Sequence, residues 1–186
     1  VTLSNSNFIY NNAFSIIGFE DNKFVKVTAL NFQNNVNGYA IYSTSSVAGT
    51  HNLSDIRIIN NSSSGIYYGG HNQLDSVVTL DNIRVENNLN MQAGITIATS
   101  KGLITNSVVK NNKLKGSAIG GFNADLTINH TDILFNELVE EGREFDASVF
   151  ISRGVDMFVE MPKDTQYSSG AVSIIGGKAN LQNINV

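Results

Sequence analysis

The chain has 186 residues, of which 41% are hydrophobic and 15% are charged, with a net charge of −4 and no cysteine. This composition is that of one soluble folded domain, and it excludes a disordered chain, a disulfide framework and thiolate metal sites. The small negative charge argues against nucleic acid as a partner. Because no apolar run approaches the roughly 20 residues of a membrane helix, we expect no membrane insertion by this segment.

An apolar anchor residue recurs along the whole chain at intervals of 24 to 27 residues. The anchors are Phe8, Phe32, Ile58, Val85, Val109, Ile133, Val159 and Val186. Three residues after the anchors runs a column of asparagines, which ends where proline takes the same place. The column is Asn11, Asn35, Asn61, Asn88, Asn112 and Asn136, followed by Pro162. This spacing predicts a structural repeat of roughly 25 residues, copied about seven times.

The segment before each anchor predicts a bent strand. In the third copy, Leu53 and Ile56 are three residues apart, a spacing that a straight strand cannot place on one face. We expect a bend at the residue three before the anchor, because asparagine, aspartate and histidine tolerate left-handed backbone and stabilise turns. The residues predicted for this second corner are Asn5, Asp55, Asn82, Asn106, His130, Asp156 and Asn183, with Ala29 in the second copy.

A third strand is predicted after each asparagine, marked by an aliphatic residue that usually follows a small one. The markers are Ile16, Ile41, Ile66, Ile95, Ile119, Val149 and Val172. Their spacing varies from 23 to 30 residues, which indicates loops of different length between strands that keep their places. The longest loop insertion is expected near residues 137–148.

Three short strands and two corners per repeat predict an all-β fold, a right-handed parallel β-helix or solenoid. Such a repeat cannot bury its apolar face alone, whereas stacked copies share a continuous core. Inward asparagines at equivalent corners are expected to hydrogen-bond to one another in a ladder. A leucine-rich repeat is disfavoured because it needs a denser leucine pattern and a helical return. We expect residues 1–186 to form a single segment, truncated in mid-coil at both ends, with further coils beyond each.

Two short motifs resemble those of a known family. Residues Phe8–Asn11 and Phe32–Asn35 match F-x-x-N, and residues 38–41 and 116–119 come within one residue of G-G-A-I. These motifs resemble the repeats of chlamydial polymorphic membrane proteins, within the broad pectin-lyase-like group of surface β-helices. The resemblance implies an adhesive or structural rod displayed outside the cell or on its surface.

The acidic and histidine residues do not predict an active site. The pectin-lyase-like resemblance would imply clustered aspartates in a carbohydrate-active enzyme, but the aspartates of this chain fall in different columns of the repeat. These are Asp55, Asp81, Asp132 and Asp156. The histidines His51, His71 and His130 are dispersed, and the charged stretch 137–146 is more typical of a solvated loop than of a calcium site. We therefore predict no catalytic residue, no metal site and no cofactor.

Two sets of residues are candidates for surface recognition. Tyr39, Tyr42, Tyr67 and Tyr68 fall at neighbouring positions of adjacent coils, so they are candidates for an aromatic contact surface; packing under a loop is the alternative. Four glycosylation sequons begin at Asn52, Asn60, Asn61 and Asn129. Asn52 and Asn129 lie in outward columns and are the better candidates for glycan attachment.

These patterns lead to a functional hypothesis of low chemical content. We expect a non-enzymatic structural or adhesive β-helix segment of a cell-surface or secreted protein, with a protein or a glycan as its partner. One alternative is a polysaccharide lyase or hydrolase with its site partly outside this segment. The other is a scaffold subunit of a large assembly.

Overall fold

A computed structural model describes residues 1–70, 75–89, 91, 93–138 and 172–186. The described residues form strands and no helix, as predicted. The strands are β1 (Thr2–Ile9), β2 (Ser15–Glu20), β3 (Phe24–Gln33), β4 (Val36–Ser45), β5 (Thr50–Ile59), β6 (Ser62–Gly70), β7 (Val77–Glu86), β8 (Ile95–Ala98), β9 (Lys101–Thr105), β10 (Val108–Lys110), β11 (Lys113–Leu114), β12 (Ile119–Leu134), β13 (Glu137–Leu138) and β14 (Val172–Asn185).

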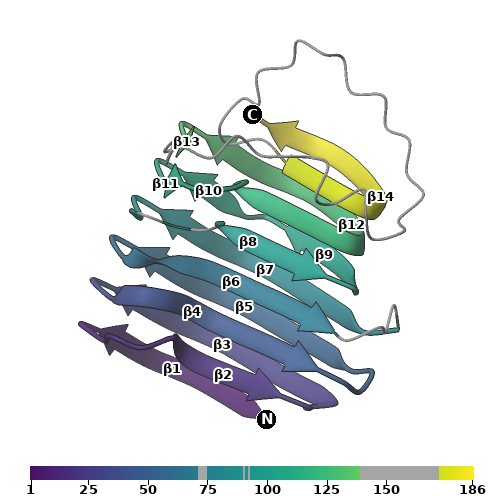
Figure 1. Ribbon diagram of the computed structural model, residues 1–186, viewed down its shortest axis with the longest axis horizontal. Helices are drawn as coiled ribbons and strands as arrows, with labels where there is room; N and C mark the ends of the chain where they lie inside the picture. Colours follow the sequence, from purple (N-terminus) through teal and green to yellow (C-terminus); the bar gives the residue numbers. More distant parts are fainter. Residues whose placement is uncertain (71–74, 90, 92, 139–171) are drawn as a thin grey trace.

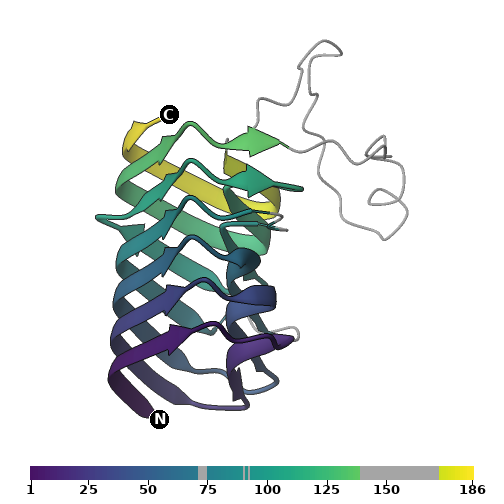
Figure 2. The same cartoon turned by 90° about the vertical axis from the view of Figure 1, so that its left-hand side faces the viewer.

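The strands stack as a parallel solenoid of about five turns (Figures 1 and 2). One wall contains β2, β4, β6 and β8 and faces the viewer in Figure 1. The rest of each coil is a longer strand that pairs with its equivalent one repeat away, in the order β1, β3, β5 and β7. This order confirms the predicted architecture, in which every strand hydrogen-bonds to a strand of the next coil.

The anchor column has the predicted register. Phe8 pairs with Phe32, which in turn pairs with Ile58, and the column continues through Val85 and Val109. The phenyl rings of the first two anchors stack with centroids 5.0 Å apart. Phe32, Ile58, Val85 and Val109 are completely buried, as befits a core shared by successive coils.

The bend before each anchor is also present. The predicted second-corner residues in the described part of the chain all have a left-handed backbone, with φ from 48° at His130 to 55° at Asp55. Ala29, the one non-polar member of the column, has φ of 56°. The left-handed residue turns β3, β5 and β7 between two faces of the solenoid without ending the strand, which explains the three-residue spacing of the buried positions.

The structure corrects the register of the third strand in the first coil. Ile17, and not Ile16, pairs with Ile41, which pairs with Ile66. Ile17 is 8% exposed, whereas Ile16 is only partly buried. A slip of one residue exchanges the inward and outward faces of a strand, so the predicted marker was wrong in this coil alone among the described ones.

A second correction concerns the C-terminal part of the stack. Strand β14 pairs directly with β12, with Ile119 opposite Val172 and Ile128 opposite Leu181. No coil lies between these two strands, although the predicted register placed one there, with Val149 as its marker and Val159 as its anchor. Those two residues, the corner residue Asp156, Pro162 and the predicted insertion beyond Leu138 lie outside the described residues. The number of turns is therefore about five instead of about seven.

Candidate functional site

The six asparagines after the anchors form the predicted ladder. The backbone N–H and the Nδ2 amide of Asn61 both donate to Oδ1 of Asn88, at 2.8 and 3.0 Å. Asn88 donates in the same way to Oδ1 of Asn112, at 3.0 and 2.9 Å. The pattern extends down to Asn11 and up to Asn136.

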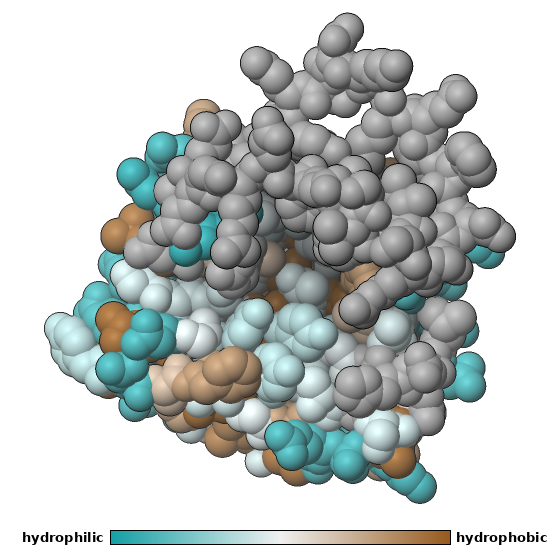
Figure 3. All heavy atoms as spheres, in the orientation of Figure 1, coloured by the Kyte–Doolittle hydropathy of each residue, from teal (hydrophilic) through white to brown (hydrophobic). Residues whose placement is uncertain are grey.

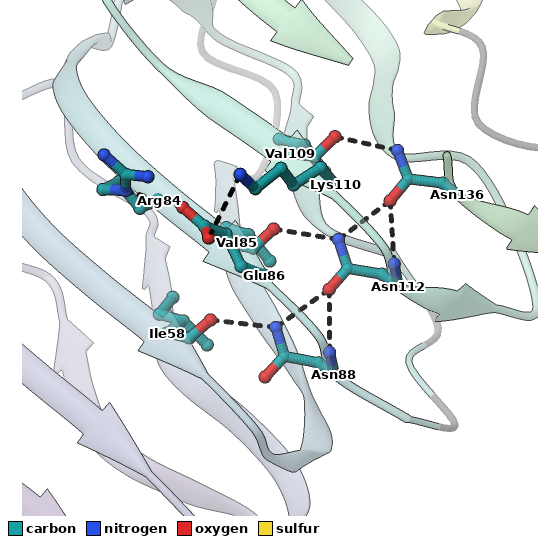
Figure 4. A network of polar contacts seen from close by, with 9 residues as sticks. All are labelled: Ile58, Arg84, Val85, Glu86, Asn88, Val109, Lys110, Asn112 and Asn136. Carbon is teal, nitrogen blue, oxygen red and sulfur yellow. Dashed lines mark hydrogen bonds and ion pairs between the residues drawn. The ribbon is translucent and has the colours of Figure 1, made fainter. Parts of the chain in front are cut away.

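Each ladder asparagine also holds the anchor strand of the coil before it (Figure 4). The Nδ2 amide of Asn88 donates to the carbonyl oxygen of Ile58 at 2.9 Å, and that of Asn112 donates to the carbonyl of Val85 at 2.9 Å. Asn88 and Asn112 are completely buried. The amides therefore satisfy backbone and side-chain groups that would be costly to bury without partners.

The left-handed residue of this first corner is the one before the ladder asparagine. It is Tyr10, Asn34, Asn60, Asn87, Asn111 and Phe135 in successive coils, with φ between 53° and 57°. The prediction assigned the corner to the ladder asparagine itself and missed this neighbour. The doubled asparagines, such as Asn34–Asn35 and Asn87–Asn88, were a usable signal, because asparagine tolerates left-handed backbone better than most residues.

The polar side chains of the second corner point outward and hydrogen-bond along the stack. Asn82 Nδ2 donates to Asp55 Oδ1 at 2.7 Å. Asp81 Oδ1 accepts from Thr105 Oγ1 at 2.7 Å and from Asn106 Nδ2 at 2.8 Å, and these hydrogen bonds lower the pKa of the Asp81 carboxyl. The two aspartates thus act as acceptors at different corners and are not brought together as a catalytic pair.

Three of the four tyrosines proposed as an aromatic contact surface lie together on the wall of β2, β4 and β6. The rings of Tyr42 and Tyr67 stack with centroids 5.0 Å apart and an interplanar angle of 14°. Tyr39 lies 5.4 Å from Tyr42 and 5.8 Å from Tyr67. Phe14, which the sequence analysis did not include, meets Tyr42 edge-on at 5.3 Å and is 67% exposed. We refer to Phe14, Tyr39, Tyr42 and Tyr67 as the aromatic surface.

The fourth tyrosine was assigned wrongly. Tyr68 is 2% exposed, because it lies two residues after Ile66 and shares its inward face. Its ring meets that of His51 edge-on at 5.0 Å inside the solenoid. His51 is 1% exposed, its Nε2 lies 2.7 Å from the Asn22 carbonyl oxygen, and burial lowers the pKa of its imidazole. This histidine is therefore a buried core residue.

The sequon asparagines differ in accessibility. Asn52 is exposed on β5, whereas Asn129 is half-buried and its Oδ1 accepts from Asn183 Nδ2 at 3.0 Å. Asn61 is 1% exposed within the ladder, and Asn60 is an exposed corner residue. Of the two predicted attachment residues, Asn52 has the more accessible amide.

A charged group next to the ladder was not predicted. Glu86, which is 8% exposed, accepts from Arg84 Nε at 2.6 Å, and its other carboxylate oxygen lies 3.7 Å from Lys110 Nζ (Figure 4). The two cations compensate the partly desolvated carboxylate. We assign this group to the packing of β7 against β10.

A shallow groove crosses the outer surface of β9, β12 and β14. Lys101, Leu103, Asp125, Thr127 and Lys178 line it with backbone and small residues between them. Asp125 supplies the one carboxylate among the described residues of the groove. Glycoside hydrolysis normally employs two carboxyl groups that flank the scissile bond, and the groove does not provide that pair.

Two searches of the described residues complete the description. They contain no group of three or more histidine, aspartate or glutamate side chains arranged to hold a metal ion. None of their segments is a helix of sufficient length and apolar character to cross a membrane.

Comparison of the chain with protein families, with curated proteins and with solved structures found no match.

Proposed function

We propose that this chain is a non-enzymatic solenoid segment of a cell-surface or secreted protein, and that it acts as a rigid spacer with an adhesive outer surface. The observation that carries the proposal is the unbroken asparagine ladder from Asn11 to Asn136. It fixes each coil to the next through buried amide hydrogen bonds, so the outer faces can vary in sequence without loss of the rod.

The distribution of polar residues supports this role. The repeated polar residues of the described coils either satisfy the interior, as Asn88 does, or stabilise an outer corner, as Asn82 does. Exposed rings such as Phe14 lie between the corners on a strand wall. The resemblance of the F-x-x-N motifs to chlamydial surface β-helices supports the cell-surface or extracellular location.

An adhesion assay paired with a cleavage screen tests the proposal. Beads coated with the 186-residue chain should adhere to a panel of animal and microbial cells above the level of albumin-coated beads. The soluble chain should release no reducing ends from a panel of plant, animal and bacterial polysaccharides. Reproducible cleavage that is lost when Asp125 is replaced by asparagine would overturn the non-enzymatic assignment, and absence of adhesion to every cell type would remove the adhesive part.

A further inference from the structure

The aromatic surface is an open-ended stack of rings. Tyr42 on β4 and Tyr67 on β6 are register neighbours, and their rings are nearly parallel. On the other side of Tyr42, the register neighbour on β2 is Gly18, which is exposed. Within 4 Å of the point where a Cβ would stand on Gly18 lie only Ser15 Oγ and the Tyr42 carbonyl oxygen. No side chain therefore continues the stack at this position.

The stacked rings are held in place along their strands. A Cβ placed on Gly69 would lie 2.8 Å from both Cε1 and the hydroxyl oxygen of Tyr67. The Tyr67 ring therefore lies flat along the wall over the glycine, where a larger residue would displace it. Phe14 and Tyr39 contact the stack from the side, edge-on and tilted respectively. A face fixed by its neighbours loses little conformational freedom when a ligand binds to it.

The polar groups around the rings carry no charge. The register neighbours of Tyr39 are Ser15 and Ser64, and that of Tyr67 toward β8 is Thr96. Close to Phe14 in sequence, Asn12 accepts a hydrogen bond from Asn37 at 2.7 Å, and both amides are exposed. Figure 3, in the orientation of Figure 1, shows pale tones at the centre of this face and deep teal mainly toward its edges.

This combination matches one class of ligand. The C–H bonds on the face of a pyranose ring carry partial positive charge, which is attracted to the negative face of an aromatic ring. The hydroxyls of the sugar require neutral donors and acceptors at the rim, such as amides and serine or threonine hydroxyls. Burial and the neighbouring tyrosines raise the pKa of Tyr39 and Tyr67, so their phenols remain neutral donors well above neutral pH. An acidic or basic ligand would find no opposite charge here.

We propose that the aromatic surface binds an uncharged oligosaccharide, with one pyranose ring stacked on Tyr42 in the place that Gly18 leaves open. The inference rests on the adhesive part of the proposed function and names its ligand class. It assigns the contact to Tyr42 and Phe14, and gives Tyr67 and Gly69 the task of holding the Tyr42 face in position.

The test is a titration of the 186-residue chain with neutral gluco-, galacto- and manno-tetrasaccharides, followed by calorimetry and by tyrosine ring NMR signals. At least one series should bind, and the Kd should rise at least about tenfold in Tyr42→Ala, because truncation of a central aromatic contact commonly has this effect. Gly18→Tyr should abolish binding by filling the open place. Gly69→Ala should weaken binding by displacing the Tyr67 ring, whereas Gly18→Ala, where an added methyl has room, should keep it.

Phe24→Ala is the matched control, because Phe24 is 73% exposed on β3 and belongs to no ring contact described here. Its Kd should stay within about twofold of the parent chain. Unchanged circular dichroism and thermal unfolding must accompany each variant; Gly18→Tyr, which removes no contact, keeps the test valid if Tyr42→Ala unfolds.

Three results would overturn the inference: no neutral sugar binds, only sialylated or uronate-containing sugars bind, or binding survives both Tyr42→Ala and Gly18→Tyr. Cell adhesion that persists when no neutral sugar binds would reject this ligand class and leave the proposed function standing. Loss of adhesion in every assay would instead reject the proposed function itself.

Discussion

The two corners of each coil employ the same residue type for different physical reasons. At the first corner, the side chain of Asn88 is buried and hydrogen-bonded to two neighbouring coils, and its own backbone is not left-handed. At the second corner, Asn82 is exposed and its backbone has φ of 53°. Side-chain chemistry therefore determines the residue at the first corner, and backbone conformation determines it at the second.

The largest expected effect follows from removing a ladder side chain. Asn88→Ala leaves the N–H of Asn61 and the carbonyl of Ile58 without their partner in the core. We expect the free energy of unfolding to fall by about 3–5 kcal/mol, since each buried unsatisfied group costs about 1–3 kcal/mol. Denaturant unfolding followed by circular dichroism measures it. Asn52→Ala, an exposed asparagine on β5, is the control and should change stability by less than about 0.5 kcal/mol.

Glycine substitutions separate the two corners. Asn82→Ala should cost about 1–2 kcal/mol, because alanine is strained in the left-handed region, whereas Asn82→Gly should recover most of that loss. At the first corner, Asn88→Gly should be at least as destabilising as Asn88→Ala, because glycine supplies no amide. Equal recovery by glycine at both positions in urea unfolding would contradict the distinction between them.

The alanine at the second corner offers a gain of stability. Ala29 is exposed with φ of 56°, so Ala29→Gly relieves strain in the left-handed region. After the entropy cost of glycine, we expect a net stabilisation of about 0.5 kcal/mol. Ala40→Gly, in the core where the backbone is not left-handed, should have the opposite sign. Thermal and urea unfolding of both variants would show whether the signs differ.

The smallest effect is a pH dependence that compares an inner with an outer histidine. Since the folded-state pKa of buried His51 is lowered, the unfolded chain binds the proton more tightly. Stability from this residue is fully present above the unfolded pKa of about 6.5 and falls as pH drops from there toward the folded value. Unfolding midpoints between pH 7.5 and 5.5 should depend on pH less in His51→Gln than in the parent chain. His130→Asn, at an exposed corner, should retain the dependence of the parent chain.

The sequence predicts the repeated part of the fold well, because every coil samples the same physical constraint. Asn88 alone says little, but six asparagines at one spacing identify an inward column. Period and spacing carry less information where only one coil decides, as at Ile16 and Ile17, which are both aliphatic and one residue apart. The direct pairing of β12 with β14 was missed because Val159 satisfied the apolar requirement of the anchor column as well as its neighbours did.

The aromatic surface was predictable in part. Tyr42 and Tyr67 share a column with a spacing of 25 residues, so the repeat places them side by side. The same spacing places Phe14 beside Tyr39, a signal that a search limited to tyrosines ignores. Tyr68 could have been assigned to the core from its two-residue offset from Ile66. Ring angles and the open place at Gly18 depend on rotamers and packing, which no spacing encodes.

The ladder has a direction, and this gives the chain a modular way to change length. Each asparagine offers its oxygen to the coil before it and its donors to the coil after it, as Asn88 does between Asn61 and Asn112. Every internal coil therefore presents the same acceptor below and the same donors above. Duplication or deletion of one complete repeat leaves every hydrogen bond of the ladder with a partner, so unequal recombination between repeats can lengthen or shorten the rod and move its outer surfaces apart in steps of one coil.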